Sequence, residues 1–143
     1  MKKWFLLAIF LFCAVLLAYC DRDNKLLPIA VPDDVVAVNI SYTSPHRLDS
    51  RQCTDAQTVQ AVTGLLREMT PRVKRVDPTS GSGGGFLDVT LCSSDGSERV
   101  YSFYATAYQP PGSNEWFFLP YEQYTEMNRL LYSLLYTTES NTP

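Results

Sequence analysis

One stretch, residues 86–106, constrains the fold more than any other because it predicts a β-hairpin. Its sequence is FLDVTLCSSDGSERVYSFYAT. Asp95 and Gly96 form a strong turn signal between two runs that are rich in β-branched and aromatic residues. The apolar residues of the first run recur at every second position, at Leu87, Val89 and Leu91. The hairpin therefore has one apolar face that other elements must cover.

Two segments that flank the hairpin have apolar residues at helical spacing. The first begins at Thr54, which forms a capping box with Gln57, and ends before Pro71. The second, residues 121–136, follows Pro120, which is tolerated at a helix start. Their apolar stripes are Val59, Val62, Leu66 and Met69, and Tyr124, Met127, Leu131, Leu134 and Leu135. Each stripe needs a sheet to pack against.

Three further runs predict strands, at residues 35–43, 72–76 and 115–119. In the first, alternation places four apolar residues on one face: Val36, Val38, Ile40 and Tyr42. The glycine-rich residues 78–85 lack the lysine and the following helix of a phosphate-binding loop, so they are expected to be a connector. The predicted order is β-α-β-β-β-β-α. We expect an α+β domain with an antiparallel sheet of four to five strands and two helices packed on one face.

The first 19 residues have the pattern of a signal peptide. Lys2 and Lys3 form a short basic region, and an unbroken apolar run follows to Tyr19. The run ends in Leu17-Ala18-Tyr19-Cys20, which resembles the lipobox of bacterial lipoproteins. Tyr19 departs from that motif, which usually has a small residue there. The resemblance implies that Cys20 receives a diacylglyceryl group and becomes the mature N-terminus.

This leader divides the chain into four parts. We expect a signal peptide at residues 1–19, a lipidated Cys20 and tether at 20–34, one domain at 35–136 and a disordered tail at 137–143. An uncleaved anchor and an ordinary secretory signal are the alternatives, and all three place the domain outside the cytoplasm. The leader and the small domain together resemble short lipoproteins of Gram-positive bacteria. The resemblance implies a cell-membrane location, with the lipid holding the domain on the extracytoplasmic face.

Two cysteines remain in the predicted domain. Cys53 precedes the first predicted helix, and Cys92 lies near the end of the first hairpin strand. A pair of cysteines outside the cytoplasm predicts a disulfide between them. Two buried thiols are the alternative.

Charge and motif content argue against several classes of function. Without the leader, ten basic residues face fifteen acidic ones, which disfavours nucleic acid as a partner. No repeated ligand spacing indicates a metal site, and no cofactor motif is present. The single histidine, His46, could serve a hydrolase only with Ser44 or Ser50 and Asp49, which are close by in one polar loop. We therefore expect a protein that is not an enzyme and has no cofactor.

Aromatic residues are concentrated in the C-terminal half. Because neighbours in a strand point to opposite faces, some of them should face away from the helices. The candidates for a binding surface are Tyr101, Tyr104, Trp116 and Phe117. Packing against loops is the alternative. A basic group formed by Arg67, Arg72, Lys74 and Arg75 fits either a charged edge strand or a contact with anionic envelope material.

The leader and the spare aromatic residues favour a membrane-anchored binding module. Its expected partners are the membrane, through the lipid, and a protein, peptide or other component of the cell envelope. An accessory subunit of an envelope complex and a small envelope hydrolase are the alternatives.

Overall fold

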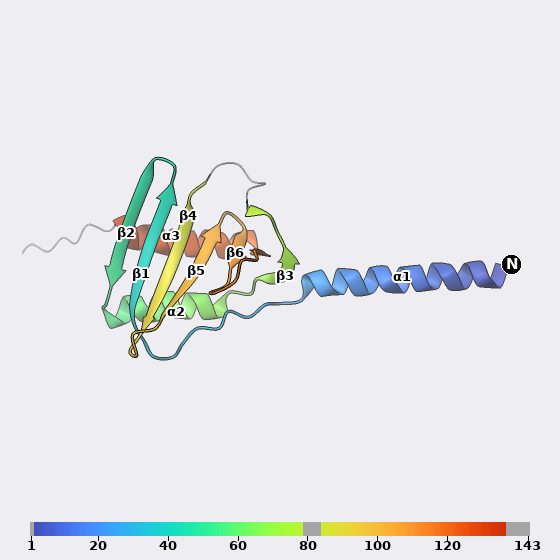
Figure 1. Cartoon of the computed structure of the whole chain (residues 1–143), viewed down its shortest axis with the longest axis horizontal. Coiled ribbons are helices and arrows are strands. Elements are labelled where there is room, and N and C mark those ends of the chain that lie inside the picture. The colour runs from blue at the N-terminus through green and yellow to red at the C-terminus, as the bar shows by residue number, and fades with distance from the viewer. Residues whose placement is uncertain (1, 79–83, 137–143) are drawn as a thin grey trace, which may run out of the picture.

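The computed structural model describes residues 2–78 and 84–136, and only the backbone of residues 2–7, 19–21 and 23. Helix α1 (Lys2–Asn24) projects away from the rest of the described chain (Figure 1). Within the described residues, no helix combines the length and hydropathy that a membrane span requires. The predicted tail, residues 137–143, and most of the glycine-rich connector lie outside the described residues.

The described residues form an α+β fold around an antiparallel sheet with the strand order β2-β1-β4-β5-β6-β7-β3. The sheet lies in front of two helices in Figure 1, α2 (Ala56–Glu68) and α3 (Tyr121–Tyr136). The predicted class is confirmed, whereas the predicted four to five strands are fewer than the seven in the described sheet. The strands are β1 (Val35–Ser44), β2 (Arg47–Cys53), β3 (Arg72–Arg75), β4 (Phe86–Ser93), β5 (Glu98–Tyr104), β6 (Ala107–Gln109) and β7 (Phe117–Phe118).

The predicted hairpin is formed by β4 and β5. Gly96 has a positive φ of 83°, and Asp95 Oδ1 accepts a hydrogen bond of 2.8 Å from the Ser97 amide. Leu87 lies opposite Phe103 in the register. The turn chemistry of Asp-Gly therefore acts here as the sequence predicts.

The core lies between the helices and one face of the sheet. Both predicted helical stripes face it, although Tyr124, Leu134 and Leu135 are only partly buried. The side chains with no exposed surface are Val62 and Leu66 of α2, Met127 and Leu131 of α3, Leu119 before α3, and Val38, Ile40, Val89, Leu91, Tyr101 and Phe103 of the sheet. Burial of this apolar area is the main force that holds the helices on the sheet.

Helix α2 begins two residues after the predicted start. Asp55 is the N-cap, and its Oδ1 accepts a hydrogen bond of 2.8 Å from the Thr58 amide. The predicted capping box of Thr54 and Gln57 is therefore wrong. Asp and Thr are both good N-cap residues, so the sequence pattern alone does not select between adjacent positions.

Strand β1 contains a bulge that changes which side chains face the core. The register with β4 shifts between Val35 and Ala37, and Val36 is left 53% exposed. Val35 packs against the core instead. The predicted core position of Val36 is wrong because a bulge reverses the alternation on one side of it.

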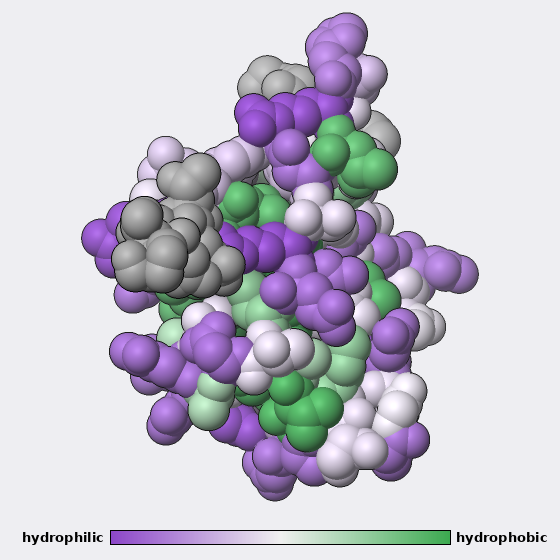
Figure 2. All heavy atoms as spheres, turned by 90° about the vertical axis from the view of Figure 1, so that its left-hand side faces the viewer, coloured by the Kyte–Doolittle hydropathy of each residue, from purple (hydrophilic) through white to green (hydrophobic). Residues whose placement is uncertain are grey.

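Two strands are absent from the prediction. Edge strand β2 has the sequence RLDSRQC, in which charged and polar residues hide the strand pattern. Strand β6 follows β5 through a tight turn in which Ala105 has a positive φ of 48°. Figure 2, a view onto the side where β2 lies, shows mainly hydrophilic side chains with separate hydrophobic spots. Charges on an edge strand discourage pairing with other sheets.

Part of the predicted tether packs on the sheet and core. The carbonyl of Lys25 accepts from the Val73 amide at 2.9 Å, and the Leu27 amide donates to the Pro71 carbonyl at 2.7 Å. Ile29 is buried in the core. Residues 25–34 therefore run along the domain as a docked segment.

Candidate functional site

The sheet has two unlike faces, and the helices cover only one. Side chains that alternate with the core residues point to the other face. The helix ribbons in Figure 1 leave this face uncovered, and we call it the open face. Predicted binding residue Tyr101 does not lie there. It is fully buried on the helix-covered face, where its hydroxyl donates a 2.7 Å hydrogen bond to the Ala30 carbonyl.

Phe117 is also on the helix-covered side. It lies directly opposite Tyr108, whose ring packs on Phe103 in the core with a centroid distance of 5.4 Å. Cross-strand partners point to the same face, so Phe117 is directed away from the open face. Alternation without a register does not show which aromatic residues face the open side. The expected exposure of Tyr101 is wrong, and the half-buried Phe117 lies on the helix-covered side rather than on the open face.

Tyr104 and Trp116, the other two candidates, come together on the open face with a third ring. The ring of Phe86 lies 4.7 Å from that of Tyr104 and 5.9 Å from that of Trp116, between centroids. We call these three residues the aromatic cluster. The Tyr104 hydroxyl accepts a 3.3 Å hydrogen bond from the Gly84 amide.

The members of the aromatic cluster differ in accessibility. Tyr104 is only 8% exposed, whereas Phe86 is 39% exposed and Trp116 is half-buried. Trp116 precedes β7, yet its ring reaches Phe86 on β4, and the Phe86 ring in turn packs on Tyr104. Phe86 was not among the predicted binding residues, although its alternation with the core residue Leu87 places it on the open face.

A line of polar side chains crosses the open face beside the aromatic cluster. The register pairs Ser41 with both Ser50 and Asp88, Asp88 with Ser102, and Ser102 with Gln109. We call these five residues the polar row. It joins five neighbouring strands, β2, β1, β4, β5 and β6. Sequence reasoning missed it because two of these strands were not predicted and their register cannot be read from the chain.

The two predicted disulfide partners lie too far apart to bond. Cys53 pairs with Val38 on one side of β1, and Cys92 pairs with Ala37 on the other side. Two strand spacings amount to about 9.5 Å, beyond the roughly 7 Å between Cα atoms that a disulfide allows. The structure accordingly has no bond between them, and the predicted disulfide is wrong.

The Cys92 thiol lies near a carboxylate. Its Sγ is 3.8 Å from Glu98 Oε1, to which it donates. Burial, followed by the charge of Glu98, raises the pKa of this thiol above its usual value. Cys92 is therefore protonated at neutral pH and a poor nucleophile.

Two of the residues considered for catalysis, Ser44 and Asp49, are held in other contacts. His46 lies exposed in the turn between β1 and β2, and the Ser44 hydroxyl donates to the Arg47 carbonyl at 3.4 Å. Asp49 forms an ion pair with Arg47 and accepts a 2.8 Å hydrogen bond from the Tyr136 hydroxyl. Asp49 thus fastens β2 to the end of α3.

The basic residues form local structural contacts. Arg67 pairs with Asp33 at 3.0 Å, and Arg75 pairs with Glu115 at 2.6 Å. Lys74 lies over the Phe118 ring, 5.9 Å from its centroid. These contacts fit an edge strand and its surroundings better than a shared anion site.

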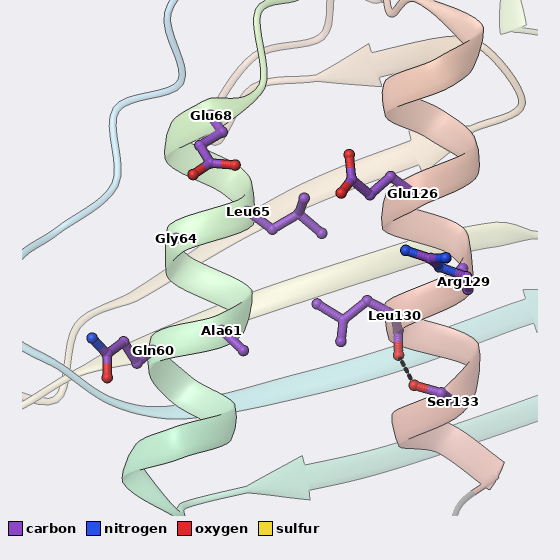
Figure 3. Close-up of a pocket in the computed structure, with 9 residues that line it drawn as sticks. All are labelled: Gln60, Ala61, Gly64, Leu65, Glu68, Glu126, Arg129, Leu130 and Ser133. Atoms are coloured by element: carbon purple, nitrogen blue, oxygen red, sulfur yellow. Dashed lines mark hydrogen bonds between the residues drawn. The ribbon is translucent and has the colours of Figure 1, made fainter.

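A shallow groove of about 450 Å³ separates α2 from α3 on the side away from the sheet (Figure 3). Leu65 and Leu130 point toward each other across it, and both pack against the core. Glu68 and Glu126 line one part of the groove. The apolar floor of the groove is the contact between the two helices, so its residues contribute to helix packing.

Comparisons with protein-family models, curated proteins and solved structures find no match to this chain. Function is therefore inferred from the leader, the aromatic cluster and the polar row.

Proposed function

We propose that this chain is a lipid-anchored protein of the extracytoplasmic membrane face, and that its domain binds an envelope component through the open face. The leader with its lipobox-like end at Cys20 supports the anchor. The aromatic cluster supports the binding role, and the single observation that carries it is the exposed ring of Phe86 on a face that α2 and α3 leave uncovered. Exposed aromatic rings mark binding surfaces because they combine large apolar area with few rotatable bonds.

The test is capture of a cross-linked partner by the full-length chain in its native membranes. Phe86→Ser and Trp116→Ser remove the accessible rings. Each should lower the captured amount about tenfold or more, because truncating an aromatic anchor typically costs about 2 kcal/mol. Tyr104 is left intact because its hydroxyl holds the Gly84 amide.

Val100→Ser is the matched control. Val100 is 45% exposed and lies on the open face of β5, outside the aromatic cluster. Its substitution should leave capture unchanged, and circular dichroism should show the same fold for all variants. Equal capture by wild type, Phe86→Ser and Trp116→Ser would remove the aromatic cluster from the binding surface.

A further inference from the structure

We propose that the polar row binds an uncharged oligosaccharide strand, with the aromatic cluster packing against the flank of its sugars. This inference deepens the proposed function and rests on it. The polar row supplies hydroxyls that donate and accept, a carboxylate that accepts and an amide that does both. A neutral sugar chain presents the complementary set of hydroxyl donors and acceptors.

The side chains of the polar row are available to a ligand. Ser50 is exposed, and Ser41, Asp88, Ser102 and Gln109 are half-buried. Within residues 2–78 and 84–136, none of the five side chains takes part in a hydrogen bond or an ion pair. Because no side chain or backbone group of the described residues pairs with them, a ligand with matching groups can bind in place of solvent.

The length of the polar row fits a chain-like ligand. Five adjacent strands are separated by four spacings, which together span about 19 Å. The row therefore extends over several sugar units. A compact small molecule would leave most of it unused.

The adjoining aromatic cluster matches the second chemical feature of a sugar. Phe86 lies two positions before Asp88 in β4, so both side chains point to the open face. One side of a pyranose ring is a flat array of C–H groups, which packs on an aromatic ring while the hydroxyls at its edge remain free. The polar row therefore matches the hydroxyl groups of a sugar, and the aromatic cluster matches its C–H face.

Charge selects a neutral ligand. Asp88 is the only charged member of the polar row, and the row contains no basic side chain. Polyanions would meet repulsion without a compensating cation. An extended peptide is disfavoured for another reason: strand addition needs an unpaired sheet edge, and the polar row crosses strands whose backbones are already paired on both sides, apart from β2.

Calorimetric titration of the full-length chain in a zwitterionic detergent tests the proposal, since a detergent with a sugar head group would compete. The titrants are hexamers of β-1,4-linked N-acetylglucosamine and of β-1,4-linked glucose, and an acidic hexamer in which every second sugar carries a carboxylate. At least one neutral hexamer should bind, and the acidic one should bind about tenfold more weakly or not at all.

Two substitutions locate the site. Asp88→Ala and Ser102→Ala should each weaken binding of the neutral hexamer, the first by about tenfold or more because it removes a charged acceptor. Glu126→Ala is the matched control, since this carboxylate lines the helix groove on the other side of the sheet. Its affinity should stay within about twofold of wild type.

The outcomes separate the two proposals. If no neutral hexamer binds while Phe86-dependent capture persists, the sugar inference fails and the proposed function stands. If no neutral hexamer binds and capture does not depend on Phe86, the sugar inference and the proposed function are both overturned. Hexamer binding that survives Asp88→Ala and Ser102→Ala, tighter binding of the acidic hexamer, or capture of a polypeptide that depends on Asp88 would each overturn the polar row as a site for neutral sugars.

Discussion

Tyr108 is a core residue whose hydroxyl is in a poor environment for charge. Burial, followed by the proximity of Tyr101, raises its pKa above the ordinary value of about 10. Burial also raises the pKa of Tyr101. The folded state therefore favours the neutral phenols and resists their ionisation.

Stability should consequently fall at alkaline pH. Because the folded pKa of Tyr108 is higher than the unfolded one, its contribution is fully present below about pH 10 and is lost as pH rises beyond it. The loss is at most about 1.4 kcal/mol per pH unit for one tyrosine. Urea unfolding from neutral to alkaline pH measures it, and Tyr108→Phe should flatten the alkaline slope. Tyr121→Phe, at an exposed position, should not; equal slopes in Tyr108→Phe and wild type would contradict the argument.

For single residues, alternation along a strand predicts which side chains are buried only where the strand is regular. Leu87, Val89 and Leu91 lie in the core as predicted, because no irregularity interrupts β4. Val36 does not, because the bulge in β1 depends on pairing with β4. Tyr101 and Tyr104 are three positions apart in β5 and so lie on opposite faces, and only the register with β4, which pairs Tyr101 with the core residue Val89, shows which of them faces the core.

Among the elements, those with a strong apolar pattern were predictable. The bounds of α3 agree with the predicted residues 121–136, and β4 and β5 form the predicted hairpin. Strand β2 was not predictable because its side chains are mostly polar. Its position depends on seven paired residues of β1 and on contacts with α3, which are remote in sequence.

One of these contacts ties β2 to the end of α3. Arg51 Nη1 donates a 2.7 Å hydrogen bond to the Leu134 carbonyl, in the last turn of the helix. A cation there satisfies a free carbonyl and complements the negative end of the helix dipole. The contact joins an edge strand to the last turn of α3, where Tyr136 also donates a hydrogen bond to Asp49 of the same strand.

Arg51→Met should therefore destabilise the fold by about 1 kcal/mol, since it keeps the apolar stem and removes the hydrogen bond and the charge. The measurement is the free energy of unfolding in urea. Arg129→Met on the exposed side of α3 is the control and should change it by less than about 0.5 kcal/mol. Indistinguishable effects of the two substitutions would show that the Arg51 contact is unimportant.

For the whole molecule, the leader and the cysteines can be examined together by intact mass. In the proposed lipid-anchored form, protein from a membrane fraction should begin at Cys20 and carry acyl chains. Reduction should add no hydrogens, because β1 separates Cys53 from Cys92. A full-length unmodified chain would contradict the anchor, and a gain of two hydrogens would contradict the arrangement of strands.

For the whole molecule, the predicted α+β class was correct, but the predicted sheet had too few strands. Hydrophobic periodicity indicates which face of each element is buried, and this was enough for an α+β sheet with α2 and α3 on one side. The polar row could not be predicted, because Ser41, Ser50 and Gln109 carry no signal of their own. They become a continuous line only when five strands are aligned.

The docked segment of residues 25–34 has a consequence for the proposed anchor. Between Cys20 and the first docked residue, Lys25, there are only four residues, which reach about 14 Å when fully extended. With so short a linker, the domain cannot move far from the lipid surface. It would therefore reach only partners that lie in the layer immediately above the membrane.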